Sequence, residues 1–149
     1  MAYSDYEFEI FSRQFILKEF SEDKIAKLEK SKVTIIGVGG IGCPLSTYLI
    51  SSGIKNLLII DGDKVEKSNL NRQILYSSEN IGEKKVEVAK NKLLKINPYA
   101  KIDIIYKNLN EKNINAISDS SIVIDTTDNW KTMKIINQFC VKNYLPLIS

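Results

Sequence analysis

Short apolar runs alternate with longer amphipathic stretches along most of the chain. The runs are rich in isoleucine, valine and leucine, and several stop at a glycine or an aspartate, as strands buried on both faces of a sheet do. They predict five strands, at residues 32–36, 57–60, 101–106, 121–124 and 146–148. The stretches between them predict helices at residues 41–52, 82–97, 110–118 and 130–143. The alternation predicts an α/β fold, a Rossmann-like parallel sheet with helices on both faces.

The residues before the first strand have a different character. Apolar residues recur there at helix-like spacing, at Phe8, Phe11, Phe15, Ile25 and Leu28. We therefore predict helix over about residues 5–30 and divide the chain into an N-terminal helical extension, 1–31, and a Rossmann-like domain, 32–149. The chain stops at Ser149, in a strand that we expect to be central or next to central in the sheet. The expectation is a fragment or short form, truncated on its C-terminal side.

Composition narrows the classes of function. The net charge of +3 is small and scattered, which argues against a nucleic-acid partner. No apolar run is long enough for a membrane span and no signal peptide is visible, so we expect a cytoplasmic protein without membrane contact. The chain has no histidine, which excludes an imidazole base, and its two cysteines, Cys43 and Cys140, form no CxxC pair.

A glycine-rich loop follows the first predicted strand and opens the next helix. In Gly37-Val38-Gly39-Gly40-Ile41-Gly42, the first glycine permits a tight turn, Gly39 a close approach to phosphate, and Gly42 close packing of helix on strand. Asp61 ends the second strand, where a carboxylate accepts hydrogen bonds from ribose hydroxyls. These features predict a nucleotide site and leave NAD, FAD and ATP equally open.

Basic residues gather near the predicted crevice. The loop 61–73 is long and polar, with a short helix expected near Asn71, and it carries Arg72, one of only two arginines beside 19 lysines. A forked guanidinium suits triphosphate oxygens, although Arg72 alone also fits a surface ion pair. Lys84 and Lys85 fall in the first turn of the helix that Gly82 is predicted to open, where a cation opposes the helix dipole. An anionic ligand near Lys85 would offset that cost, which makes Lys85 a candidate phosphate ligand. An equal alternative is that this lysine-rich chain simply tolerates the small electrostatic cost.

Two acids, Asp125 and Asp128, follow the fourth predicted strand. This end of a parallel sheet is where open α/β folds bind their ligands. A dehydrogenase has little use for acids beside its pyrophosphate, whereas an ATP enzyme needs carboxylates for Mg²⁺. The acids therefore favour ATP over NAD, with solvated loop acids as the alternative.

Together these segments resemble the ThiF/MoeB/HesA family, bacterial relatives of the ubiquitin-activating enzymes. The resemblance runs from about residue 6 to the end and is carried by SRQFIL at 12–17, VTIIGVGGIGCPLSTYLISSGIKNLLIIDGDKVEKSNLNRQIL at 33–75, IGEKKVEVAKNKLLKINP at 81–98 and IVIDTTDN at 122–129. It implies an adenylyltransferase that uses ATP and Mg²⁺ to activate the C-terminal carboxylate of a ubiquitin-like sulfur-carrier protein ending in Gly-Gly, for thiamine or molybdopterin synthesis. The domain 32–149 is then an ATP-binding domain.

The resemblance also assigns roles to single residues. Its nucleotide contacts would be Gly37, Gly39, Gly40, Gly42, Asp61, Asn69, Arg72, Lys85, Asp128 and Asn129. Catalysis would rest on Arg13, Arg72, Lys85 and Asp128, with Asp128 also serving Mg²⁺. Arg13 matches an arginine that reaches the partner's site across the family's dimer, so a homodimer is expected. A C-terminal carboxylate is already ionised, so its attack on phosphorus needs no general base, in accord with the missing histidine.

The match has departures, and alternatives stay open. Ile10 stands where the family often has an arginine, and Lys24-Ile25 replaces Gly-Gln. The zinc-binding CxxC pairs and any catalytic cysteine would belong to an absent C-terminal half, so Zn²⁺ is expected only there. The alternatives are an NAD-dependent oxidoreductase, and a truncated paralogue that binds nucleotide without catalysis.

Overall fold

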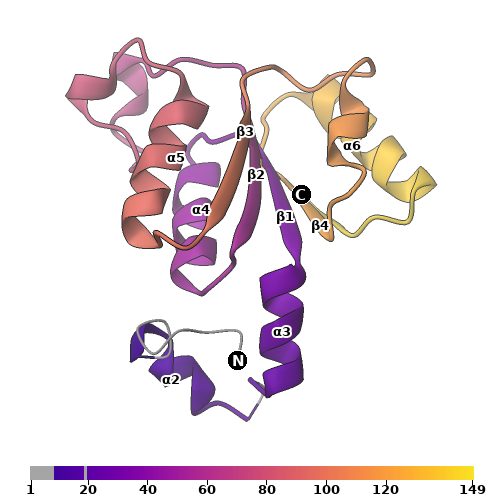
Figure 1. Ribbon diagram of the computed structural model, residues 1–149. Helices are drawn as coiled ribbons and strands as arrows, with labels where there is room; N and C mark the ends of the chain where they lie inside the picture. The colour runs from indigo at the N-terminus through magenta and orange to yellow at the C-terminus, as the bar shows by residue number, and fades with distance from the viewer. Residues whose placement is uncertain (1–8, 19) are drawn as a thin grey trace.

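A parallel five-stranded sheet forms the centre of the computed structural model, which describes residues 9–18 and 20–149 (Figure 1). The strand order is β3-β2-β1-β4-β5, and all four strand pairs are parallel. The strands are β1 (Lys32–Ile36), β2 (Asn56–Ile60), β3 (Lys101–Ile105), β4 (Ile122–Asp125) and β5 (Leu147–Ile148). The Rossmann-like α/β prediction is confirmed, and all five strand predictions agree with the structure to within one residue at each end.

Helices cover both faces of the sheet. In Figure 1, α4 and α5 lie on one face and α6 on the other. The α-helices of this layer are α4 (Gly42–Ser51), α5 (Lys85–Ile96) and α6 (Trp130–Lys142), and the 3₁₀ helices are η1 (Lys67–Asn69), η2 (Ser78–Asn80) and η3 (Ile114–Ile117). None of the helices in the described part of the chain is long and apolar enough to span a bilayer.

Successive side chains of the central strands enter two separate cores. Ile35 packs in the core beneath α4 and α5, whereas its neighbour Ile36 packs in the core beneath η3 and α6. Both isoleucines are almost completely buried. The continuous apolar runs are thus explained by burial on both faces, as parallel sheets require.

The chain changes direction within the sheet at β1. From β1 it proceeds outward to β2 and β3 with α4 and α5 on one face, then returns to β4 and β5 with η3 and α6 on the other. The connections after β1 and β4 therefore diverge, which opens a crevice at the carboxyl ends of these two neighbouring strands. The glycine loop follows β1, and Asp128 follows β4.

Three local predictions were wrong. Helix α5 begins at Lys85 rather than at Gly82, because residues 82–85 pair with the preceding loop: Val65 N donates to Glu83 O (2.8 Å), Gly82 N to Val65 O (2.9 Å) and Lys85 N to Asp63 O (3.0 Å). The polar segment 110–118 forms only a 3₁₀ turn, η3, and the short helix expected near Asn71 is η1, centred three residues earlier. Polar runs with few apolar anchors define their helices poorly.

The N-terminal extension is helical but interrupted. It contains α2 (Ser12–Phe15) and α3 (Glu22–Lys30), with turn and bend residues after α2, instead of one continuous helix. Residues 5–8 and 19 of the predicted helix lie outside the described residues. Figure 1 shows α3 leading into β1 at the end of the sheet where the strands start, with α2 beyond it. The fifth strand, expected at or near the centre, is an edge strand among the five described here.

Candidate functional site

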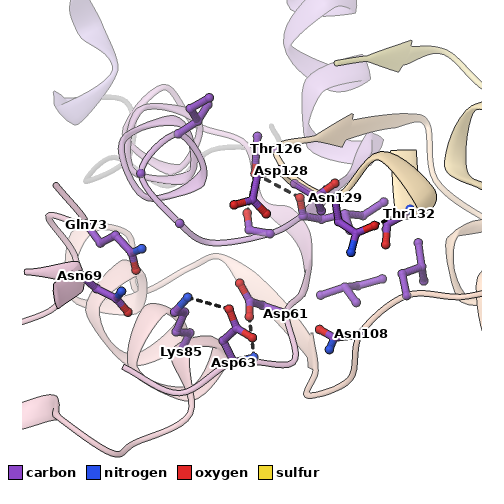
Figure 2. A pocket seen from close by; sticks show the side chains of 18 of the residues that line it. Asp61, Asp63, Asn69, Gln73, Lys85, Asn108, Thr126, Asp128, Asn129 and Thr132 are labelled. Atoms are coloured by element: carbon purple, nitrogen blue, oxygen red, sulfur yellow. Dashed lines mark hydrogen bonds and ion pairs between the residues drawn. The ribbon is translucent and has the colours of Figure 1, made fainter. Parts of the chain in front are cut away.

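A pocket of about 760 Å³ lies at the carboxyl ends of the strands (Figure 2). Its lining comes from the glycine loop, the loop after β2, the start of α5, the loop after β3 and the loop after β4. The sequence-predicted residues that line it are Gly37, Gly39, Gly40, Asp61, Asn69, Arg72, Lys85, Asp128 and Asn129. Segments from Ile36 to Thr132, far apart along the chain, therefore meet around one cavity.

The glycine loop is shaped by backbone constraints. Gly37 has φ +90°, a conformation that side chains disfavour, and its carbonyl accepts a hydrogen bond from Thr126 Oγ1 (2.6 Å). Gly42 does not line the pocket: a Cβ at this position would overlap the Gly37 carbonyl oxygen. Gly42 thus permits the close packing of α4 on the loop, and α4 starts directly at the pocket with its electropositive end.

Asp61 sits at the centre of the lining. Its Oδ2 accepts a hydrogen bond from Val38 N (2.8 Å) and its Oδ1 from Asp63 N (2.7 Å), so the side chain fastens the glycine loop to the end of β2. Burial raises the pKa of this carboxyl, and the two amide donors and nearby Lys85 counteract part of that rise. Each carboxylate oxygen retains a lone pair for a further donor.

Lys85 and Asp63 form an ion pair within the pocket. Lys85 Nζ lies 3.0 Å from Asp63 Oδ2, and the lysine side chain is 7% exposed against 62% for the aspartate. Figure 2 shows the two side chains pointing toward one another beside Asp61. Lys85 is thus a buried cation at the pocket whose ion-pair partner is a solvent-exposed carboxylate, an arrangement that leaves its ammonium available to an anion in the pocket.

Arg72 and Asn69 reach the pocket from the loop that includes η1. Arg72 Nη1 donates to Ser68 O (2.9 Å) and to Asn71 Oδ1 (3.1 Å), and its side chain is exposed. Asn69 is buried, and its Oδ1 accepts from Glu66 N (3.1 Å), which closes the η1 capping box. The surface ion pair considered for Arg72 is not present among the described contacts.

The loop after β4 supplies the other wall. Asp128 is exposed at the pocket, while Asp125 is buried and accepts hydrogen bonds from Thr127 N (2.9 Å) and Thr127 Oγ1 (2.7 Å). Asn129 Oδ1 accepts from Thr132 N (3.1 Å) and caps α6. In Figure 2, Asn69 and Gln73 lie on one side of Asp61, and Asn129 and Thr132 lie on the other.

Arg13, unlike the other predicted site residues, lies in a different part of the fold. It is exposed on α2, at the end of the sheet opposite the pocket (Figure 1). Within a single chain it does not approach the other site residues.

The pocket also includes residues that sequence reasoning missed. They are Ile36, Ile41, Ile60, Asp63, Gln73, Lys107, Asn108, Leu109, Thr126, Thr127 and Thr132. Asp63 follows Asp61 at the two-residue spacing of extended chain, a signal that could have identified it. Lys107, Asn108 and Leu109 follow β3, and only the sheet order reveals that they reach the pocket.

The family model described as the ThiF family matches residues 11–149. The chain belongs to the ThiF family. This assignment agrees with the motifs of the glycine loop and of the loop 61–73, which line the same pocket.

Two curated relatives in Escherichia coli (strain K12) illustrate the match. The chain is 40% identical to the molybdopterin-synthase adenylyltransferase over 147 residues. This match covers 98% of the present chain and 59% of that protein. The chain is 37% identical to the sulfur carrier protein ThiS adenylyltransferase, with the same coverage. The chain thus spans about three fifths of the length of these relatives, both of which are named as adenylyltransferases.

A solved structure supports the fold and the nucleotide. The E. coli tRNA N6-threonylcarbamoyladenosine dehydratase TcdA, in complex with ATP, superimposes with a TM-score of 0.89 at 26% identity, over 97% of this chain and 59% of that one. A protein of the same fold is thus found in complex with ATP. An NAD-dependent oxidoreductase is not favoured.

Proposed function

We propose that this protein binds ATP with Mg²⁺ in the pocket and adenylates the C-terminal carboxylate of a ubiquitin-like sulfur-carrier protein, of the thiamine or molybdopterin type. The observation that carries the proposal is the convergence of the glycine loop, Asp61, Arg72, Lys85 and Asp128 on one cavity. The names of the two curated relatives support the carrier protein as the substrate.

The nucleotide roles follow from what each group offers. Asp61 would accept hydrogen bonds from the ribose, through the lone pairs that Val38 and Asp63 leave free. The loop around Gly39 and Gly40 would hold phosphate at the start of α4. Asn69, Arg72 and Lys85 would lie along the phosphates on one side, and Asn129 would contact the nucleotide from the other.

Mg²⁺ fits a site that it shares with the nucleotide. Among the described residues, no three acidic or thiol side chains gather closely enough to bind an ion by themselves. Asp128, an exposed carboxylate at the pocket, suits a magnesium ion that takes its other ligands from phosphate oxygens and water, as is usual for this ion. When bound, the ion would neutralise charge on the phosphates.

The chemistry requires positioning and charge compensation. A carboxylate oxygen of the carrier attacks the α-phosphorus of ATP, the bond to the bridging oxygen breaks, and pyrophosphate leaves with its electron pair. Arg72 and Lys85 are placed to compensate negative charge on the transferred and departing phosphates. Arg13 lies at the end of the sheet opposite the pocket of its own chain, so it would contribute only to the pocket of a second copy. This role therefore depends on a homodimer.

Exchange of labelled pyrophosphate into ATP tests the proposal. The protein is incubated with purified ubiquitin-like carriers ending in Gly-Gly, one of thiamine and one of molybdopterin type, each beside a form that lacks the terminal glycine. We expect exchange only with an intact carrier. Asp128→Ala and Lys85→Met should abolish it, whereas Lys84→Met, an exposed lysine that pairs with Glu87, should not.

The other outcomes identify the alternatives. ATP binding without exchange under any carrier would indicate a nucleotide-binding paralogue without catalysis. Exchange that depends on tRNA instead of a carrier would replace the proposed substrate class, and binding of NAD in preference to ATP would refute the proposal altogether.

A further inference from the structure

The segment that carries Arg72 runs along the glycine loop in reversed order. A Cβ at Gly40 would lie 3.6 Å from Cγ and Cδ of Arg72, and a Cβ at Gly39 would lie 3.7 Å from Nε2 of Gln73. One step further along, Tyr76 Oη donates a hydrogen bond to Val38 O (2.8 Å). Arg72, Gln73 and Tyr76 thus contact Gly40, Gly39 and Val38 in turn. Of these three contacts, the one from Tyr76 is a hydrogen bond.

Both backbone polar groups of Val38, in the two peptides that flank its Cα, are hydrogen-bonded to side chains. Its N–H donates to Asp61 Oδ2 (2.8 Å), and its carbonyl accepts from Tyr76 Oη and, more weakly, from Cys43 Sγ (3.4 Å). Val38 and Cys43 are fully buried and Tyr76 is 7% exposed, so water does not compete for this carbonyl. Burial raises the pKa of Tyr76 far above its ordinary value, which keeps the phenol a neutral donor.

We propose that Tyr76 is a positioning residue for nucleotide binding. Its hydroxyl fixes the Val38 carbonyl and thereby aligns the glycine loop with the Arg72 segment. The inference rests on the proposed function, because it assumes that ATP phosphate lies between these two segments. A phenylalanine would fill the same volume in the core, so the hydroxyl is accounted for by this bond.

The backbone of Val38 connects the two halves of the proposed nucleotide site. Asp61, the expected ribose ligand, accepts from the N–H of Val38, and Tyr76, from the segment with the expected phosphate ligand Arg72, donates to the carbonyl of Val38. Cys43 does not substitute for the phenol, because a thiol is a weak donor. Loss of the hydroxyl would leave the loop packed but its register against Arg72 less well defined.

Tyr76→Phe tests the inference by calorimetric titration with ATP. We expect ATP to bind about three- to tenfold more weakly, the range for losing one hydrogen bond to a buried carbonyl. The matched control is Thr34→Val, which removes a buried hydroxyl whose partner is Ser120 Oγ (2.6 Å); neither residue lines the pocket. Urea unfolding should show that both variants lose stability, and only Tyr76→Phe should lose ATP affinity.

A double-mutant cycle with Arg72→Ala separates positioning from general destabilisation. If Tyr76 acts through the alignment of Arg72, Tyr76→Phe weakens ATP binding less in the Arg72→Ala background than in the wild type. The inference would be overturned if Tyr76→Phe left the ATP affinity unchanged, or if the fold-losses of affinity from the two substitutions simply multiplied in the double variant. Either result would leave the proposed function intact. A wild-type protein that binds no ATP would overturn both.

Discussion

Gly42→Ala should damage the protein through the backbone of the glycine loop. A Cβ at this position would overlap the carbonyl oxygen of Gly37 and would lie 2.9 Å from Thr126 Oγ1. The overlapped atom belongs to the backbone, so the loop itself has to move, and the hydrogen bond from Thr126 to Gly37 O is strained or broken. Overpacking of this kind costs about 1–3 kcal/mol, and a lost hydrogen bond about 1 kcal/mol. We therefore expect the free energy of unfolding to fall by about 2–4 kcal/mol.

Gly40→Ala is the matched control for this substitution. A Cβ there meets only the flexible side chain of Arg72, at ordinary contact distance. Its free energy of unfolding should stay within about 1 kcal/mol of the wild type, as for other alanines at compatible loop positions. Urea unfolding followed by circular dichroism measures both variants. Equal stability of the Gly42→Ala and Gly40→Ala proteins would refute the packing argument.

Three further outcomes follow from the pocket. Adenosine, which has no phosphate to titrate, should bind more weakly as the pH falls through the raised pKa of Asp61, because protonation removes an acceptor; calorimetry should show no such dependence in Asp61→Asn. Lys85→Met should weaken ATP binding by about one to two orders of magnitude, as expected for loss of a charge-assisted hydrogen bond, and leave adenosine binding unchanged. Thr126→Val should lower the free energy of unfolding by about 1 kcal/mol, because it removes the donor to the Gly37 carbonyl, and Thr126→Ser should restore most of that loss in urea unfolding.

The strands and the glycine loop could be predicted because their signals are local. The first strand was predicted at residues 32–36 and occupies Lys32–Ile36, since an uninterrupted β-branched run ending at a glycine has few other interpretations. The start of α5 could not be predicted in this way, because Gly82 and Lys84 pair with a loop some twenty residues earlier. Local periodicity carries no information about such a pairing.

The site was predictable wherever side chains follow strands directly. Asp61 and Asp128 were found in this way, since the carboxyl ends of parallel strands share one edge of the sheet. Gln73 was missed because its place in the pocket depends on the path of a loop with little regular structure. Asn129 shows the reverse difficulty: its side chain caps α6, a structural task that the motif alone does not distinguish from a nucleotide contact.

The backbone pairing between residues 63–65 and 82–85 bears on how a ligand would enter. Long polar loops beside a binding pocket are often lids that close over the ligand. Here the pairing ties the loop to the first turn of α5, so this wall stands in place before any ligand arrives. Association from this side would not wait for a conformational step. Its rate should instead rise in direct proportion to the ligand concentration, as for diffusion into a preformed site.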